Sequence, residues 1–329
     1  MEAERSDKLD AASRGSRENI GDRLPKLTIL LVTYNHEKYI GQALDGLLIQ
    51  EVPFSYDVVI ADDASTDETR EHIAHRLSEA GIVHRFLDHS KNLGITKNYQ
   101  RALFSCSGEY VAVLEGDDYW VRTDKLSKQV EYLDIHRECA GCSANYFVYD
   151  QSVELFYPRI PQSEDISYVD SRSLIADNLI GNFSTCVYRR SSLSNIPRSV
   201  FDVKSYDWIV NICISQHGLI AFMHEIMSVY RLHSSGTWSA LSNEEKIRDQ
   251  ILQIETYDAI TGRVFEAEFK ASKNRLTGQL AGSGQLRRQG WVGGALRLIH
   301  SFVPPIVLRG LRRTIPNGMR RLILGVMGY

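Results

Sequence analysis

Short apolar runs alternate with longer amphipathic stretches over the first third of the chain. The run Leu27–Val32 is continuous in aliphatic and β-branched residues, and further apolar runs lie at 57–61, 83–87 and 110–114. Uninterrupted runs of this kind are typical of strands that are buried on both faces of a parallel sheet. Helical stretches are expected between them, and this alternation predicts an α/β fold with right-handed crossovers.

Polar clusters follow the apolar runs. They are TYNHE after the first run, DDASTD after the second, NLG after the third and EGDD after the fourth. In open α/β sheets, ligands bind beyond the carboxyl ends of the parallel strands. The four clusters therefore predict a single ligand site at one edge of the sheet.

The clusters also exclude two common phosphate-binding devices. The turn TYNHE contains no glycine, so the GxGxxG fingerprint of a dinucleotide-binding domain is absent, and the chain has no GxxxxGK[ST] loop. The strand ends carry carboxylates instead, and carboxylates bind hard divalent cations that in turn bind phosphate. We therefore expect Mg²⁺ or Mn²⁺ as the cofactor.

Five motifs give the chain a family resemblance. They are TILLVTYNHEKYI, VVIADDASTDET, NLGITKN, GEYVAVLEGDDYW and SYDW, and in this order they resemble the family 2 inverting glycosyltransferases that build bacterial surface polysaccharide. The resemblance covers about residues 26–235. It implies the GT-A nucleotide-diphospho-sugar transferase fold, with a Rossmann-like, mainly parallel sheet flanked by helices. We expect a disordered tail over 1–25, the GT-A domain over 26–240 and a basic, helical C-terminal extension over 241–329.

The resemblance assigns nucleotide-sugar contacts to Tyr34, Glu37, Asp63, Lys97 and Asp117. By this resemblance, the carboxylate of Asp63 accepts a hydrogen bond from the imide N–H of uracil or thymine, a role that requires a hydrogen-bond acceptor. It places Tyr34 against the base and Lys97 near the diphosphate. A solvated helix lysine is an equal alternative for Lys97.

The cluster Glu115-Gly116-Asp117-Asp118 occupies the place of the family's DxD metal motif. By resemblance, Asp117 and Asp118 share the metal and the ribose, and Glu115 supports them. His233 matches a position where the family places a histidine on the metal or the diphosphate, and imidazole is a suitable ligand for Mn²⁺. The alternatives are a helix-capping acidic turn and a histidine that is only hydrogen-bonded.

An inverting transfer needs a general base on the acceptor side. Asp207, in the motif SYDW, matches the family's position for this base at the start of a helix. A single carboxylate there is enough for direct displacement with inversion. The alternative is an acidic residue that only stabilises the helix N-terminus.

The resulting functional hypothesis is metal-dependent, inverting transfer from a nucleotide-diphosphate sugar to a hydroxyl of a glycan or polyprenyl-linked acceptor. A UDP-sugar is favoured, and a dTDP-sugar is the second choice. Two alternatives stay open. A sugar-1-phosphate nucleotidyltransferase normally needs a glycine-rich loop, which TYNHE does not supply. A non-catalytic scaffold that binds sugar nucleotides or glycans would bind UDP without turnover.

Charge is distributed unevenly along the 329 residues. Glu268 is the last acidic residue, and 11 of the 38 basic residues lie beyond it, which leaves 27 basic against 41 acidic residues over 1–268. A basic segment rich in Leu, Ile and Val is suited to an anionic membrane surface, so residues 286–329 are a candidate membrane contact. Helices packed on the catalytic domain, with solvated arginines, are the alternative. Nothing else in the chain favours nucleic acid as a partner.

The N-terminal 23 residues are polar and lack the apolar core of a secretory signal, and no run of 18 apolar residues occurs. The five cysteines are odd in number and scattered, as is usual in a reducing compartment. These features predict a cytoplasmic protein, and the basic segment adds peripheral contact with the inner face of the cell membrane as a hypothesis.

Overall fold

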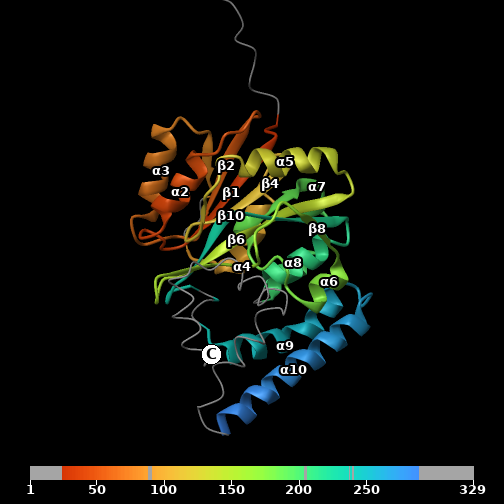
Figure 1. The fold of residues 1–329 in the computed structure, drawn as a ribbon. Helices are drawn as coiled ribbons and strands as arrows, with labels where there is room; N and C mark the ends of the chain where they lie inside the picture. The colour runs from red at the N-terminus through yellow and green to blue at the C-terminus, as the bar shows by residue number, and fades with distance from the viewer. Residues whose placement is uncertain (1–23, 88–90, 204–205, 237, 239–240, 289–329) are drawn as a thin grey trace, which may run out of the picture.

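The computed structural model describes residues 24–87, 91–203, 206–236, 238 and 241–288. Within these residues a ten-stranded mixed sheet forms the centre of the molecule (Figure 1). Its order is β3-β2-β1-β4-β9-β6-β10-β5, with β7 paired to β6 and β8 paired to β10. The strands are β1 (Leu27–Thr33), β2 (Tyr56–Asp62), β3 (His84–Phe86), β4 (Tyr110–Glu115), β5 (Tyr119–Trp120), β6 (Cys139–Asp150), β7 (Leu155–Pro158), β8 (Ile166–Val169), β9 (Val187–Arg189) and β10 (Leu219–Leu232).

Helices cover both faces of the sheet, and each face has its own apolar core (Figure 1). One core is packed under α2, α3 and α5, and the other under α4, α6 and α8. These helices are α2 (Ile40–Leu48), α3 (Thr69–Glu79), α4 (Ile95–Leu103), α5 (Lys125–Ile135), α6 (Ser171–Ala176) and α8 (Tyr206–Ile214). The shorter α7 (Arg190–Ser194) and the 3-10 helices η1 (Phe183–Thr185) and η2 (Arg198–Asp202) lie in the connections.

The register of β1 explains why the polar clusters meet. Thr33, the last residue of β1, is paired with Asp62 of β2, and Val32 is paired with Glu115 of β4. All three strands are parallel, so their carboxyl ends reach the same edge of the sheet. The predicted strands and the α/β class are thus confirmed.

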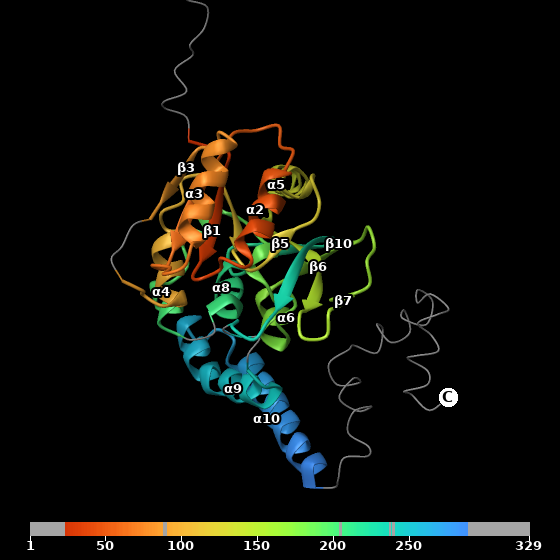
Figure 2. The same cartoon turned by 90° about the vertical axis from the view of Figure 1, so that its left-hand side faces the viewer.

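Two C-terminal helices, α9 (Asn243–Ile260) and α10 (Glu266–Arg288), pack below α6 and α8 (Figure 2). Helix α9 begins with a capping box in which Ser242 and Glu245 satisfy each other's backbone N–H groups. The ring of Tyr257 packs edge-on against Trp208 of α8 at 5.7 Å between centroids. The described part of the expected extension is therefore joined to the second apolar core, and residues 289–329 lie outside the description, as does the expected N-terminal tail up to Arg23.

All five cysteines are buried as free thiols. None of the helices in the described part of the chain has the length and apolar character that a membrane span needs.

Candidate functional site

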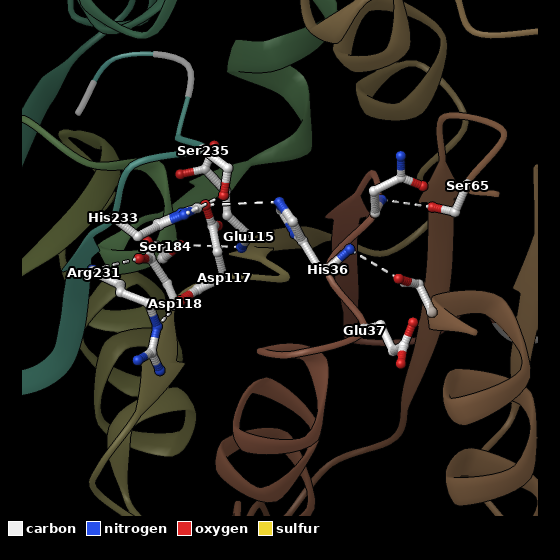
Figure 3. A network of polar contacts seen from close by, with 12 residues as sticks. His36, Glu37, Ser65, Glu115, Asp117, Asp118, Ser184, Arg231, His233 and Ser235 are labelled. Atoms are coloured by element: carbon white, nitrogen blue, oxygen red, sulfur yellow. Dashed lines mark hydrogen bonds and ion pairs between the residues drawn. The ribbon is translucent and has the colours of Figure 1, made fainter. Parts of the chain in front are cut away.

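The turns after β1 and β2 are bonded to each other. Asn35 donates its backbone N–H to Ser65 Oγ (2.9 Å), and Thr66 donates its N–H to Asn35 Oδ1 (2.8 Å) (Figure 3). Asn35 and Ala64 adopt positive φ angles of 53° and 60°, which non-glycine residues rarely do. Backbone strain of this kind is concentrated at ligand sites, because the surrounding structure must enforce it.

Asp63 lies directly behind these turns and is almost fully buried. Its two carboxylate oxygens accept the backbone N–H groups of Leu93 and Gly94, each at 2.9 Å. Asn92 in turn donates its side-chain amide to the carbonyl of Asp63 (3.0 Å). The structure therefore joins two of the predicted clusters through the residue that was predicted to recognise the base.

The other predicted nucleotide contacts lie in different surroundings. Tyr34 directly follows β1 and is 42% exposed. Glu37 donates its N–H to Asp67 Oδ2 (3.1 Å), and its carboxylate accepts the N–H of Glu68 (3.4 Å). Lys97 forms an exposed ion pair with Asp202 of η2. The structure thus places Glu37 in the joined turns and Lys97 against η2.

The two aspartates after β4 have opposite surroundings. Asp118 is 1% exposed and accepts three hydrogen bonds, from Asn182 Nδ2 (2.9 Å), Ser184 Oγ (2.7 Å) and the backbone N–H of Arg231 (3.0 Å). Burial and the charge of Asp117 raise the pKa of Asp118 to about 7. Every oxygen of this carboxylate is directed into the protein, which makes Asp118 a structural anchor of the turn.

The carboxylate of Asp117 instead meets two histidines. His233 Nε2 lies 3.1 Å from Asp117 Oδ2, and His36 Nε2 lies 3.7 Å from the same oxygen (Figure 3). Burial opposes ionisation of Asp117, but the hydrogen bond from His233 and the charges of both histidines lower its pKa overall. Burial also lowers the pKa of His36.

His233 is oriented through its other ring nitrogen. Its Nδ1 is 2.9 Å from Ser235 Oγ, which fixes the plane of the imidazole. Asp117 Oδ2 and His233 Nε2 lie 3.1 Å apart, and an oxygen ligand together with a nitrogen ligand suits Mg²⁺ or Mn²⁺. Among the described residues no group of three His, Cys, Asp or Glu side chains comes together as a metal site, so a cation here would need further ligands from its substrate and from water.

Glu115 ends β4 beneath this turn. Its carboxylate accepts the hydroxyl of Tyr99 (2.9 Å), and its backbone N–H donates to Ser184 Oγ (3.0 Å). Burial, together with the charges of Asp118 and Asp117, raises the pKa of Glu115 well above its ordinary range.

Asp207 lies at the start of α8, as predicted. Asn178 Nδ2 donates to Asp207 Oδ2 at 3.4 Å, and the carbonyl of Asn178 accepts Arg159 Nη2 at 2.7 Å. Burial raises the pKa of Asp207. The carboxylate is therefore hydrogen-bonded to a neutral amide.

The motif analysis missed several residues that build this site. Asn182 lies just before η1 and Ser184 lies in it, about 65 positions from the turn that they support. His36 stood unremarked inside a matched motif, and Arg231 lay outside the five motifs. Only the packing of η1 against the end of β4 brings Asn182 and Ser184 to the turn, so no local signal marks them.

The fold and the site define an open α/β protein whose ligand site lies at the carboxyl edge of its parallel strands. The family model for glycosyl transferase family 2 matches residues 28–196. The chain therefore belongs to glycosyltransferase family 2.

Curated relatives match the same part of the chain. The uncharacterized protein Rv1520 of Mycobacterium tuberculosis is 37% identical over 223 residues, which are 67% of this chain and 63% of the relative. The putative teichuronic acid biosynthesis glycosyltransferase TuaG of Bacillus subtilis is 27% identical over 66% of this chain and 84% of its own. The Escherichia coli glucosyltransferase WfaP, which is named for UDP-Glc and α-D-GlcNAc-diphosphoundecaprenol, is 26% identical over 68% and 83%. The chain spans less than two thirds of the Mycobacterium relative's length.

Solved structures share the fold. A Staphylococcus aureus TarS fragment in complex with UDP-GlcNAc superposes with a TM-score of 0.54 at 20% identity, over 70% of this chain and 65% of the other. The Pyrobaculum calidifontis mannosyltransferase PcManGT, in complex with GDP-Man and Mn²⁺, gives 0.55 at 16% identity over 85% and 80%. The predicted fold class is thereby confirmed.

Proposed function

We propose that this protein is a metal-dependent, inverting glycosyltransferase that moves a sugar from a UDP-sugar to a hydroxyl of a glycan or lipid-linked acceptor. The observation that carries the proposal is the pairing of Asp117 with His233 at the edge of the sheet where the strained turns meet. Family membership supplies the reaction class, and this pairing supplies a cation site for the diphosphate.

The sugar-nucleotide donor binds at the turns after β1 and β2, which are hydrogen-bonded to each other. Tyr34 offers an exposed ring face to the base, and stacking on such a ring contributes about 1–3 kcal/mol. The resemblance gives Asp63 the imide of uracil, and the N–H groups of Leu93 and Gly94 fix the position of its carboxylate. Uracil is favoured because both the TarS complex and the name of WfaP carry UDP, although PcManGT was solved with GDP-Man.

Asp117 and His233 are the residues that would hold Mg²⁺ or Mn²⁺. The ion, when bound, neutralises the diphosphate as it leaves. Asp118, which the sequence also proposed as a ligand, serves in this arrangement to keep the turn in position through Asn182 and Ser184. His36 faces the same carboxylate oxygen of Asp117 at 3.7 Å, a contact that the sequence did not suggest.

Asp207 takes the proton from the acceptor hydroxyl. Its carboxylate is held by Asn178, and its raised pKa makes it a stronger base than an exposed aspartate. Attack on the sugar carbon from the face opposite the diphosphate inverts the anomeric centre, so one carboxylate is sufficient.

The acceptor side favours a membrane-linked substrate. WfaP is named for a diphosphoundecaprenol acceptor, and the basic segment 286–329 of this chain carries no acidic residue. A polyprenyl-linked oligosaccharide at the inner face of the cell membrane would place this segment against anionic lipid. Surface polysaccharide synthesis is the process that this substrate serves.

Calorimetric titration with UDP, GDP, dTDP and CMP, each with and without Mn²⁺, tests the proposal. We expect UDP to bind more tightly with Mn²⁺, and Asp117→Asn and His233→Ala each to remove at least about tenfold of that gain. Asp45→Asn is the control. Asp45 is an exposed residue of α2 that is paired with Arg76 of α3, and this variant should bind UDP and Mn²⁺ like the wild type.

Two results would overturn parts of this proposal. Unchanged Mn²⁺-dependent affinity in Asp117→Asn and His233→Ala would refute the metal site. Tight UDP binding without hydrolysis or transfer of any UDP-sugar would favour the scaffold.

A further inference from the structure

Arg231 joins β10 to the turn that carries the two aspartates. Its backbone N–H donates to Asp118 Oδ1 (3.0 Å), and its side-chain Nε–H donates to the backbone carbonyl of Asp117 (2.9 Å). The residue is only 6% exposed. Arg231 thus connects both Asp117 and Asp118 to β10. His233 follows Arg231 by two positions and lies just after the end of this strand.

The guanidinium of Arg231 is enclosed by three tyrosines, which we call the tyrosine cage: Tyr39, Tyr119 and Tyr149. The ring centroids lie 5.0, 5.5 and 5.5 Å from its central carbon, within the range of cation–π attraction. Its Nη2 donates to Gln42 Oε1 on α2. The guanidinium is therefore surrounded by aromatic rings and neutral oxygens. These contacts restrict the orientation of its N–H groups.

The cage also contacts the metal-site histidine. The ring of Tyr39 lies 4.6 Å from the ring of His233, between centroids. Tyr39 therefore packs on Arg231 with one contact and on His233 with another. Figure 3 shows Arg231 and His233 approaching the Asp117–Asp118 turn from β10, while His36 approaches it from the opposite side.

A cation held by Asp117 and His233 requires a fixed distance between two separate chain segments. Asp117 lies in the turn after β4, and His233 lies just after β10. Strand β5, which follows the turn, is paired with β10 only through Ser228–Trp120 and Val229–Tyr119. The bonds of Arg231 continue this short pairing to the aspartates themselves.

We propose that Arg231 is a positioning residue for the metal site, which keeps Asp117 Oδ2 and His233 Nε2 directed at one point. This inference rests on the proposed function. Arg231 acts through Asp117 and His233, because its Nε–H is bonded to the Asp117 carbonyl and its guanidinium packs on Tyr39, which in turn packs on His233. Lysine cannot replace it, since an ammonium lacks the planar fork that reaches both oxygens while stacking on the rings.

The test compares Arg231→Lys with Arg189→Lys in the full chain. Arg189 on β9 is a matched control: its Nε donates to the Cys139 carbonyl (2.7 Å), its Nη2 to the His136 carbonyl (3.0 Å), and its guanidinium lies 5.4 Å from the Tyr110 ring. Arg189 makes the same kinds of contact as Arg231, but it lies beside Tyr110 at the start of β4, whereas the aspartate turn follows the end of β4. Mn²⁺ affinity is measured by electron paramagnetic resonance, and UDP affinity by calorimetry with Mn²⁺ and with EDTA.

We expect Arg231→Lys to weaken Mn²⁺ binding in the presence of UDP by about 10–100-fold, the usual effect of losing a residue that orients metal ligands. UDP affinity in EDTA should stay within about twofold of the wild type, because the base-binding turns do not depend on Arg231. Arg189→Lys should lower the melting temperature without changing Mn²⁺ affinity.

Wild-type Mn²⁺ affinity in Arg231→Lys, or an equal loss in Arg189→Lys, would overturn the inference. If Arg231→Lys does not fold, Tyr39→Leu removes one wall of the cage and should reduce Mn²⁺ affinity in the same direction, and an unchanged affinity would again overturn it. A wild type that binds no UDP with Mn²⁺ refutes the proposed function, whereas equal UDP and Mn²⁺ binding by wild type and Arg231→Lys refutes only the role of Arg231.

Discussion

Adjacent side chains can carry different tasks when their surroundings differ, as Asp117 and Asp118 show. Asp118 accepts three hydrogen bonds inside the protein, whereas Asp117 faces two histidines. The pKa of Asp118 is raised to about 7 and that of Asp117 is lowered. The surroundings thus favour the ionised form of Asp117 more than that of Asp118.

This division predicts different consequences of the same substitution. Asp118→Asn should lower the free energy of unfolding by about 1–3 kcal/mol, because its amide cannot accept all three hydrogen bonds. Asp117→Asn should lower that free energy by less, about 0.5–1.5 kcal/mol, because it weakens a single hydrogen bond to His233. Urea unfolding of both variants measures the difference, and equal stabilities would contradict the structural role of Asp118.

Replacing the proposed base affects turnover more than binding. Asp207→Asn should retain donor affinity and lower kcat by about 10²–10⁴-fold, the usual contribution of a general base. Transfer assays with saturating UDP-sugar and Mn²⁺ measure this loss. Unchanged kcat would place the base elsewhere.

The pH profile provides an independent check of Asp207. The base works when ionised, so kcat/KM should fall about tenfold per unit as the pH decreases below its pKa. Because burial raises this pKa above 3.8, the decline should begin at a higher pH than for an ordinary aspartate. A profile that is flat down to pH 4 in the wild type would contradict the assignment.

At the scale of elements, helix α2 is fixed by close contact with β5. A Cβ on Gly46 would lie 2.6 Å from the backbone nitrogen and 2.7 Å from the backbone oxygen of Trp120, whereas a Cβ on Gly41 would meet nothing within 4 Å. The close approach matters because Trp120 directly follows the aspartate turn and donates its indole N–H to the Ser184 carbonyl (2.7 Å).

The two glycines provide a matched pair within one helix. Gly46→Ala should destabilise the protein by about 1–3 kcal/mol, because backbone atoms must move. Gly41→Ala should be neutral or stabilising by up to about 1 kcal/mol, since alanine favours the helix. Thermal unfolding of both variants measures the contrast, which would be absent if α2 did not pack on β5.

At the scale of the whole molecule, the C-terminal helices support α6 and α8, the helix that carries the proposed base. Tyr257 of α9 packs on Trp208, the neighbour of Asp207, and Arg275 of α10 donates to the Ala176 carbonyl (2.7 Å) at the end of α6. Helix α8 is thus held between the sheet and α9.

The membrane hypothesis is tested by sedimentation with vesicles. The full chain should sediment with vesicles that contain anionic lipid and much less with neutral vesicles, at low ionic strength. A chain that ends at Arg288, the last residue of α10, should not sediment with either. Equal behaviour of the two chains would refute the contact through this segment and leave packed helices as the interpretation.

The sequence by itself determined the parallel strands β1 to β4, and it predicted the edge of the sheet where the candidate site lies and the candidate residues there. It could do so because apolar runs bury both faces of parallel strands, and because the residues after such strands must meet at one edge. Asp63, Asp117, His233 and Asp207 each stand directly after a strand or at a helix start, where local pattern is informative.

Only the tertiary structure decided what each carboxylate faces. Asn182, Ser184 and Arg231 reach Asp118 across 64 to 113 positions of the chain, and nothing in the local sequence of EGDD records them. It also decided that Lys97 lies against Asp202, because η2 packs on α4. Local sequence sets the position of a side chain on the backbone, but its hydrogen-bond partners come from long-range packing, and these partners separate an anchoring aspartate from one free to face a ligand.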